Sequence, residues 1–150
     1  MNMPFTVVIR VRYGECDQQG VVFNARYGDY INTAALEFLR VTLGGHNILE
    51  AFDLDSQTVR MTTEWRSSVK YDDIVDITVE TVRAGNSSYT LEMRFREHFS
   101  QRAVASSEIV CVMVDRTSLQ KRQVPEEIRK GLLRNASGAI IDYSGLGSMR

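Results

Sequence analysis

The feature that most constrains this chain is residues 27–43, a segment whose apolar side chains cover most sides of a helix. The apolar positions are Tyr30, Ile31, Ala34, Ala35, Leu36, Phe38, Leu39, Val41 and Leu43, and the polar ones form one narrow stripe of Asp29, Thr33, Glu37 and Arg40. A helix that is apolar on most sides is buried on most sides. Polar residues interrupt the segment and no run of about 18 apolar residues occurs, so we expect no membrane span. Protein must therefore wrap the helix.

The segments around this helix have the alternating pattern of strands that supply such a wrapping. The pattern predicts strands over residues 5–13, 58–69, 74–82, 89–96 and 103–115. The last of these contains the continuous apolar run 109–114, which is typical of a central strand with both faces covered. Pro125 followed by two glutamates predicts a short helix over 125–133. The order predicts an α+β fold in which a long antiparallel sheet curls around one helix.

Length and composition limit the organisation and the partners of the chain. Its 150 residues fit one domain, expected over residues 1–134, and residues 135–150 lose the pattern and are predicted to be a flexible tail. A net charge of −1 with 25% charged residues gives no field of either sign, so nucleic acid is not an expected partner. The two cysteines form no CxxC pair and only two histidines occur, so neither zinc nor a disulfide framework is expected. With no secretion signal at the N-terminus, we expect a cytoplasmic protein.

The loop at residues 14–20 places one carboxylate, Asp17, shortly before the helix. A carboxylate can attack a carbonyl carbon or deprotonate water, and the free N–H groups at a helix start can stabilise an oxyanion. From spacing alone, however, such an aspartate is more often a turn former or a helix cap. Gly20 fits a plain turn and a close approach of substrate to the backbone equally well.

Residues 10–27, Arg-Val-Arg-Tyr-Gly-Glu-Cys-Asp-Gln-Gln-Gly-Val-Val-Phe-Asn-Ala-Arg-Tyr, resemble a family signature. It is that of hot-dog-fold acyl-CoA thioesterases of the 4-hydroxybenzoyl-CoA thioesterase type, close to the Tol–Pal-associated branch. The matching positions are Tyr13, Asp17, Gly20, Val21, Val22, Phe23 and Tyr27, and the likeness extends over about residues 5–133. The chain departs from the family pattern at Asn24, where that branch often has His, and at Ser68, where the family often has Pro.

The resemblance implies a hot-dog fold and hydrolysis of an acyl-CoA to a carboxylic acid and free CoA, with no cofactor. Asp17 would act as general base or nucleophile, and the backbone N–H of Asn24 would polarise the carbonyl. Substrate contacts would come from Tyr13, Gly20, Val21, Phe23 and Tyr27, and the candidates for binding the CoA phosphates are Lys70, Arg83, Arg116, Lys121 and Arg122. The family also implies a homodimer that continues the sheet, shares its active sites and pairs into a tetramer. The acyl group and the choice between the two mechanisms stay open.

Other interpretations of the same residues stand beside this one. A hot-dog domain can hold an acyl-CoA or an acyl-carrier protein without turnover, whereas a hydratase would usually pair the aspartate with a histidine. Cys16 is a possible nucleophile with His46 or His98 as base, although no motif places them together. Glu37 could be a second carboxylate, but its polar stripe favours a solvated or inter-subunit position. Tyr27 fits a core ring better than a catalytic acid.

Overall fold

The elements of the fold follow the expected order of one strand, one long helix and a run of long strands. The computed structural model describes residues 3–45 and 47–148. Its strands are β1 (Phe5–Arg10), β2 (Leu54–Trp65), β3 (Ile74–Ala84), β4 (Ser88–Glu97), β5 (Ala103–Asp115) and β6 (Ile140–Asp142), and its α-helices are α1 (Tyr27–Thr42), α2 (Ile48–Ala51) and α3 (Glu126–Arg134). Short 3-10 helices span Tyr13–Glu15, Asn24–Arg26 and Leu146–Ser148. The predicted α+β class is confirmed.

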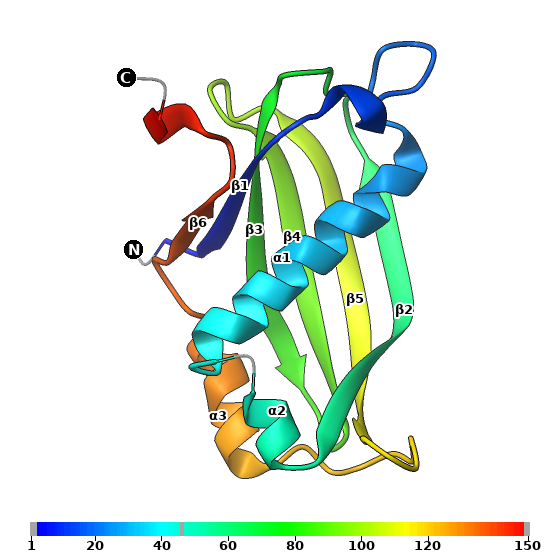
Figure 1. Cartoon of the computed structure of the whole chain (residues 1–150), viewed down its shortest axis with the longest axis vertical. Coiled ribbons are helices and arrows are strands. Elements are labelled where there is room, and N and C mark those ends of the chain that lie inside the picture. The colour runs from blue at the N-terminus through cyan, green and yellow to red at the C-terminus, as the bar shows by residue number, and fades with distance from the viewer. Residues whose placement is uncertain (1–2, 46, 149–150) are drawn as a thin grey trace.

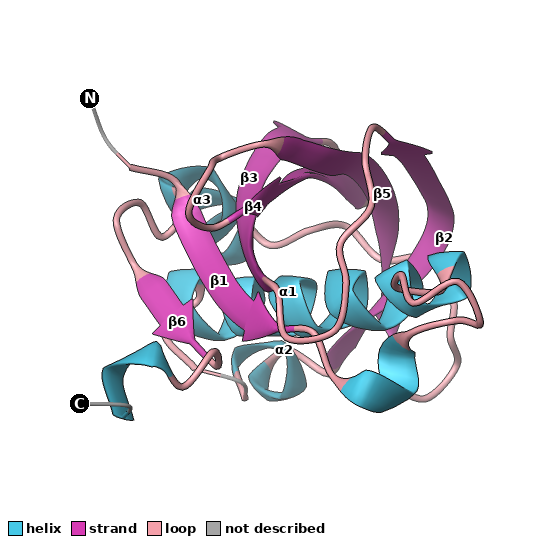
Figure 2. Ribbon diagram, turned by 90° about the horizontal axis from the view of Figure 1, so that it is seen from above, coloured by secondary structure: helices cyan, strands magenta, loops and turns pink. Residues whose placement is uncertain are grey.

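The strands form one sheet that curls around α1, as the apolar circumference of that helix requires. The strand order is β2-β5-β4-β3-β1-β6, and all neighbours are antiparallel except the parallel pair β1 and β6. Figure 1 shows α1 crossing the face of the sheet, with α2 and α3 near the C-terminal end of α1. Seen from above in Figure 2, the strands surround the helix on one side. None of the described helices is long and apolar enough to cross a membrane.

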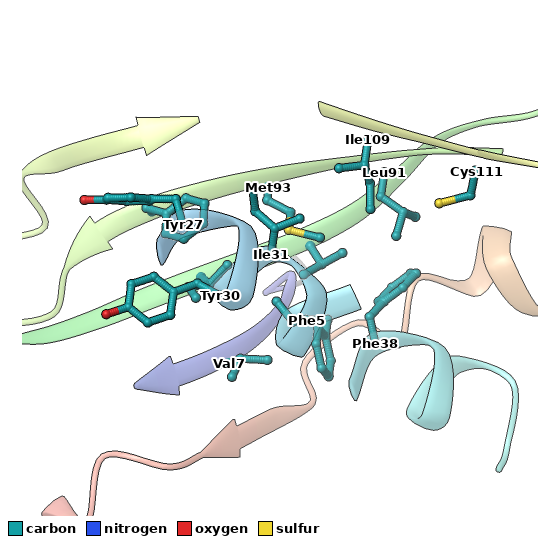
Figure 3. Packing of buried hydrophobic residues seen from close by; sticks show 14 of the residues in the cluster. Phe5, Val7, Tyr27, Tyr30, Ile31, Phe38, Leu91, Met93, Ile109 and Cys111 are labelled. Atoms are coloured by element: carbon teal, nitrogen blue, oxygen red, sulfur yellow. The ribbon is translucent and has the colours of Figure 1, made fainter. Parts of the chain in front are cut away.

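The core lies between α1 and the inner face of the sheet. Phe5, Ile31 and Phe38 are fully buried there, and the rings of Phe5 and Phe38 meet edge to face at 5.6 Å (Figure 3). The strands contribute alternate residues, such as Leu91 and Met93 of β4, because successive side chains of a strand point to opposite faces. Burial of each large apolar side chain stabilises the fold by about 1.5–3 kcal/mol.

The surface of α1 differs from the expectation at two kinds of position. Glu37, expected in a solvated or inter-subunit place, is only 7% exposed and lies 3.3 Å from the Arg40 guanidinium. Conversely, Leu36 and Val41 of the apolar set are exposed, Leu36 at 51%. The difference arises because a segment far along the chain covers the side of the helix with Glu37, whereas no described residue covers Leu36 and Val41 to the same extent.

That distant segment belongs to residues 135–148, part of the predicted flexible tail. Ile140–Asp142 form β6, which pairs in parallel with β1, and the Tyr143 hydroxyl donates a hydrogen bond of 2.9 Å to Glu37. The expectation of a patternless tail is therefore corrected for the described part of this segment. A three-residue strand is too short to show an alternating pattern, and its partner is more than 130 residues away in sequence.

Strand and helix ends show smaller differences. β1 stops at Arg10, so that Tyr13, expected on the inner face of a strand, lies in a 3-10 helix. β2 begins at Leu54, four residues earlier than expected, because a bulge between Thr58 and Arg60 interrupts its alternation. The connection after α1, expected to be irregular, contains the short helix α2.

Candidate active site

The loop that carries Asp17 folds as a narrow two-stranded ribbon between β1 and α1. The Asp17 N–H donates to the Val21 carbonyl at 2.8 Å, and the Phe23 N–H donates to the Glu15 carbonyl at 2.9 Å. At the tip, the Gly20 N–H returns to the Asp17 carbonyl at 2.9 Å and closes a tight turn. Asp17 therefore lies in the turn, and the other arm of the ribbon leads directly to the start of the helix.

The Asp17 carboxylate is half-buried and its two oxygens differ in their contacts. Oδ1 accepts hydrogen bonds from the N–H groups of Gln19 at 2.7 Å and Val21 at 3.4 Å. Oδ2 has no hydrogen-bond partner in residues 3–45 and 47–148. Asp17 is thus the turn former that loop chemistry favours, and one of its oxygens remains available for another role.

Unpaired backbone amides lie where the ribbon enters the helix. Asn24 begins the 3-10 helix Asn24–Arg26, which continues into α1. The Arg26 N–H is accepted by the Phe23 carbonyl at 2.9 Å, whereas no acceptor in the described part of the chain meets the N–H groups of Asn24 and Ala25. Such first-turn amides carry the positive end of the helix dipole and suit a developing oxyanion.

Four of the predicted substrate-contact residues lie in or beside this ribbon. Tyr13 is 82% exposed and its ring meets that of Tyr71 edge to face at 5.9 Å. Gly20 has φ +82° and open space where a Cβ would lie, so the turn conformation explains this glycine. Val21 is half-buried, and Phe23 immediately precedes Asn24 with an exposed ring.

Tyr27, the fifth predicted contact, is mainly a core ring. It is buried against Tyr30, Trp65 and Phe95, with ring centroids 5.5–5.8 Å apart. In Figure 3 its hydroxyl points out of the hydrophobic cluster. Burial raises the pKa of Tyr27 to about 12, so the phenol is neutral near pH 7.

Of the five basic candidates for CoA phosphates, the single chain brings only Lys70 to the ribbon. Lys70 forms an isolated β-bridge with Val21. Arg83 lies at the opposite end of β3, whose 11 residues span roughly 35 Å. The other three, Arg116, Lys121 and Arg122, follow the far end of β5, where Arg116 pairs with Glu50 at 2.9 Å and Arg122 with Asp115 at 3.0 Å.

Neither Asp17 nor Asn24 lines either of two cavities among the described residues. One, of about 510 Å³, lies on the sheet face away from α1 and is lined by charged residues of β2 and β4, including Arg60, Glu92 and Arg94. The other, of about 410 Å³, lies between α1 and β2 and is mainly apolar, with Leu36, Leu39, Leu43, Ile48 and Leu49 in its wall.

The structure also places the residues of the competing interpretations. The Cys16 thiol is half-buried, and its contact is the Arg12 carbonyl at 3.8 Å. His98 is engaged elsewhere, with Nδ1 2.7 Å from an Asp76 oxygen, and His46 lies outside the described residues. Glu37 is held by Tyr143 and Arg40 rather than by the ribbon. No group of His, Cys, Asp and Glu in the described residues could hold a metal ion.

Three residues beside the ribbon carry no motif in the sequence. Glu15 accepts a hydrogen bond of 2.8 Å from the Tyr30 hydroxyl. Trp65, at the end of β2, packs on Tyr27. Arg102 donates to the Ser67 hydroxyl and to the Ser68 carbonyl, which fixes the strand exit at the position where the family often has Pro. Only the position of Glu15, two residues before Asp17, could have drawn attention to one of these residues.

Comparison with known proteins decides the family. Residues 11–132 match the thioesterase-like superfamily. The chain belongs to this superfamily. The match includes the ribbon, all of α1 and the four long strands β2, β3, β4 and β5, so it covers both the candidate site and the elements that position it.

Individual members of the thioesterase-like superfamily align over most of the chain. The acyl-CoA thioesterase YbgC of Haemophilus influenzae is 24% identical over 126 residues, which cover 83% of this chain and 91% of the relative. The acyl-CoA thioester hydrolase YbgC of Escherichia coli O157:H7 is 26% identical over 120 residues, covering 80% and 89%. The recognised family type is therefore confirmed.

Solved structures confirm the hot-dog fold. The gentisyl-coenzyme A thioesterase BH1999 superposes with a TM-score of 0.74 at 23% identity, covering 85% of this chain and 98% of its own. The probable thioesterase YbaW of Escherichia coli gives a TM-score of 0.77 at 21% identity, covering 87% and 98%. The Staphylococcus aureus protein SAV2348, solved in complex with CoA, gives 0.81 at 13% identity, covering 90% and 87%.

Proposed function

We propose that this protein is an acyl-CoA thioesterase. The reaction consumes one acyl-CoA and one water and yields a carboxylic acid and free CoA. One observation carries the proposal. In this member of the thioesterase-like superfamily, the Asp17 carboxylate has one unpaired oxygen, and its ribbon leads to the unpaired N–H groups of Asn24 and Ala25 at the start of the 3-10 helix before α1. The acyl-CoA activity named for the YbgC relatives supports the choice of substrate.

Asp17 can act by either of two mechanisms in this proposal. As a general base, Oδ2 takes a proton from water while the water oxygen bonds to the thioester carbon and the carbonyl becomes an oxyanion. The oxyanion then reforms the carbonyl as the C–S bond breaks, and the departing CoA thiolate takes the proton from Asp17. As a nucleophile, Oδ2 bonds to the carbon itself, the CoA thiolate leaves, and water hydrolyses the resulting anhydride. In both routes the Asn24 N–H donates to the oxyanion, an interaction worth roughly 2.7–4 kcal/mol in comparable sites.

The proposed active enzyme is a homodimer, paired further into a tetramer. β2 is hydrogen-bonded to β5 on one side, and its other edge has no partner strand among the described residues. Exposed Met61 on this edge and exposed Leu36 on α1 leave apolar surface that a second copy would cover. An antiparallel pairing of two β2 strands would also bring the far-end arginines of one copy toward the Asp17 ribbon of the other.

The remaining features follow from this chemistry. A carboxylate, backbone amides and water suffice for the reaction, so we propose no resident cofactor; CoA is part of the substrate. Lys70 is the nearest basic candidate for the CoA phosphates within one chain, and Arg116 or Arg122 would come from the second copy. The unpaired Cys16 and Cys111 suit the reducing cytoplasm.

Substitution of Asp17 tests the proposal. Asp17→Asn keeps an oxygen that can accept the Gln19 and Val21 N–H groups but cannot accept a proton or attack carbon. We expect kcat for thiol release to fall by about 10²–10⁴ with the melting temperature almost unchanged. Asp17→Ala should lose the same activity and, in addition, about 0.5–1.5 kcal/mol of stability from the turn. Wild-type turnover by Asp17→Asn on every cleaved acyl-CoA would remove Asp17 from the mechanism.

Two observations favour a second candidate, a module that binds acyl-CoA or an acyl-carrier protein without turnover. Asn24 stands where the related branch often has His, and the Asp17 carboxylate has a structural role in its own turn. A panel of aryl-, short- and long-chain acyl-CoAs, followed with a thiol reagent and by calorimetry, separates the two. Tight binding without thiol release across the panel would support the module.

A further inference from the structure

Glu15 connects the Asp17 ribbon to the helix that supplies the amides. Its side-chain oxygen Oε1 accepts the Arg12 N–H at 2.7 Å and the Tyr30 hydroxyl at 2.8 Å. Its main-chain carbonyl accepts the Phe23 N–H at 2.9 Å. One half-buried residue is thus bonded to Arg12 after β1, to the opposite arm of the ribbon at Phe23 and to α1 at Tyr30.

The partner of this carboxylate is itself rigidly placed. Tyr30 is buried, and its ring meets Tyr27 edge to face at 5.8 Å, so the core fixes the direction of its hydroxyl. Figure 3 shows that hydroxyl pointing out of the hydrophobic cluster. Burial and, next, the hydrogen bond to Glu15 raise the pKa of Tyr30, so the phenol remains a donor at neutral pH.

The position of Glu15 matters because Asp17 and Asn24 lie on opposite arms of the ribbon. Asp17 is two residues after Glu15, and Asn24 directly follows Phe23, the residue whose N–H the Glu15 carbonyl accepts. Backbone hydrogen bonds at Glu15 and Asp17 hold the two arms together, while the Glu15 side chain fixes one arm to the Arg12 N–H and, through the Tyr30 hydroxyl, to α1. Plain capping of the 3-10 helix would need only the Arg12 N–H contact.

We propose that Glu15 is a positioning residue that holds the Asp17 carboxylate and the Asn24 N–H at the separation thioester hydrolysis requires. This inference rests on the proposed thioesterase activity and assigns Glu15 no contact with substrate. Misplacement of reacting groups by about 1 Å can cost on the order of 10² in rate, so the effect belongs in kcat.

Three variants and one matched control test this role. Glu15→Gln keeps an Oε1 that accepts both hydrogen bonds, so kcat should stay within about threefold of wild type. Glu15→Ala should lower kcat by about 10–100-fold with KM changed less than about threefold. Tyr30→Phe, which removes only the anchor on α1, should lower kcat by a smaller factor. Glu127→Ala, an exposed glutamate on α3, should match wild type.

The outcomes separate this inference from the proposed function. If the wild-type protein hydrolyses acyl-CoA and Glu15→Ala has an unchanged kcat, the positioning role is overturned. A loss in Glu15→Gln equal to that in Glu15→Ala would also overturn it, because the negative charge would then be what matters. If no acyl-CoA is hydrolysed by wild type, the thioesterase proposal fails on its own.

Amide hydrogen exchange tests the positioning without turnover. The Phe23 and Asp17 N–H groups close the ribbon, so Glu15→Ala should speed their exchange by about tenfold while amides of β3 and β4 keep their rates. Tyr30→Phe should move the same two amides in the same direction, which guards against poor folding of the alanine variant. Unchanged exchange at both amides in both variants would overturn the inference.

Discussion

At the scale of single residues, the proposed mechanism gives the Asp17 side chain a chemical role beside the structural one that the turn shows. Oδ1 is used by the turn that sets the position of the carboxylate, and Oδ2 is left for substrate or water. At Asn24 the side chain and the backbone N–H likewise have to be considered separately. Its side chain replaces a histidine of the related branch, but the group assigned to catalysis belongs to the backbone, which every residue except proline provides.

One substitution, to proline, can therefore remove the backbone N–H of residue 24. Phe23 has φ −62° and ψ 132°, which suits a residue before proline, and Asn24 is the first residue of its helix, where proline is tolerated. Asn24→Pro should fold but lose the oxyanion donor, lowering kcat by about 10²–10³. Asn24→Ala keeps the N–H and should retain most activity in the same thiol-release assay. Equal activity of the two variants would exclude this amide.

How far the site could be predicted depends on whether its geometry is local. The ribbon, its turn at Gly20 and the entry into α1 lie within one stretch of sequence, so Asp17 and Asn24 could be placed together. Lys70 could be named but not located, since its β-bridge to Val21 joins distant segments. Arg83 and Arg122 matched the chemistry of phosphate binding, but strand length carries them to the other end of the sheet.

At the scale of elements, α1 brings tyrosine hydroxyls to the edge of the core. Burial raises the pKa of Tyr27 from its ordinary value of 10.0 to about 12. A raised pKa contributes stability that is fully present below about pH 10, the unfolded-state value, and is lost as pH rises toward about 12. The free energy of unfolding should therefore fall between about pH 10 and 12, whereas near neutrality this group makes it neither rise nor fall with pH.

Tyr27→Phe checks that linkage. The Tyr27 hydroxyl has no hydrogen-bond partner in the described part of the chain, so the variant should match wild type at pH 7. Between pH 10 and 12 the wild type should lose about 1–2 kcal/mol more of its free energy of unfolding than the variant, allowing for solvent contact of the hydroxyl. Urea unfolding at stepped pH measures the difference. Parallel curves throughout would show that ionisation of Tyr27 is not linked to folding.

The C-terminal segment is a second element whose contribution can be measured. The Tyr143 hydroxyl supplies one of two partners of the buried Glu37 carboxylate, the other being Arg40. Tyr143→Phe should cost about 1–2 kcal/mol and lower the melting temperature by about 2–6 °C. Tyr71→Phe, at another exposed tyrosine, is the matched control and should not change it. A melting temperature unchanged by Tyr143→Phe would mean that the bond contributes nothing to stability.

The elements also divide by how well sequence predicts them. The predicted strand 103–115 has the same two ends as β5, because its continuous apolar run is bounded by polar residues on both sides. α1 was placed to within one residue at its C-terminal end, because Gly44 with φ +79° follows it. β6 was missed because pairing with β1, rather than any preference of Ile140–Asp142, makes it a strand.

At the scale of the whole molecule, the single chain leaves its apolar pattern incomplete. A helix with so much apolar surface was expected to be covered on most sides, yet Leu36 and Val41 are exposed. β2 adds exposed Val59, at 61%, and Met61 along an edge with no partner strand in the described residues. Tyr13 and Phe23, on either side of the Asp17 turn, are exposed as well. One twofold partner placed along β2 would cover these surfaces together.

Met61→Lys tests this arrangement because it puts a charge on the β2 edge without reaching the Asp17 ribbon. The variant should be monomeric at micromolar concentration by light scattering, where wild type should be at least dimeric, since burying an unpaired ammonium is unfavourable. Thioesterase activity should fall with the dimer if the second copy contributes to the site. Leu133→Lys, at an exposed leucine of α3, should leave both assembly and activity unchanged. A dimeric Met61→Lys protein would show that β2 is not the interface. A monomeric and fully active wild type would show that one chain suffices for catalysis.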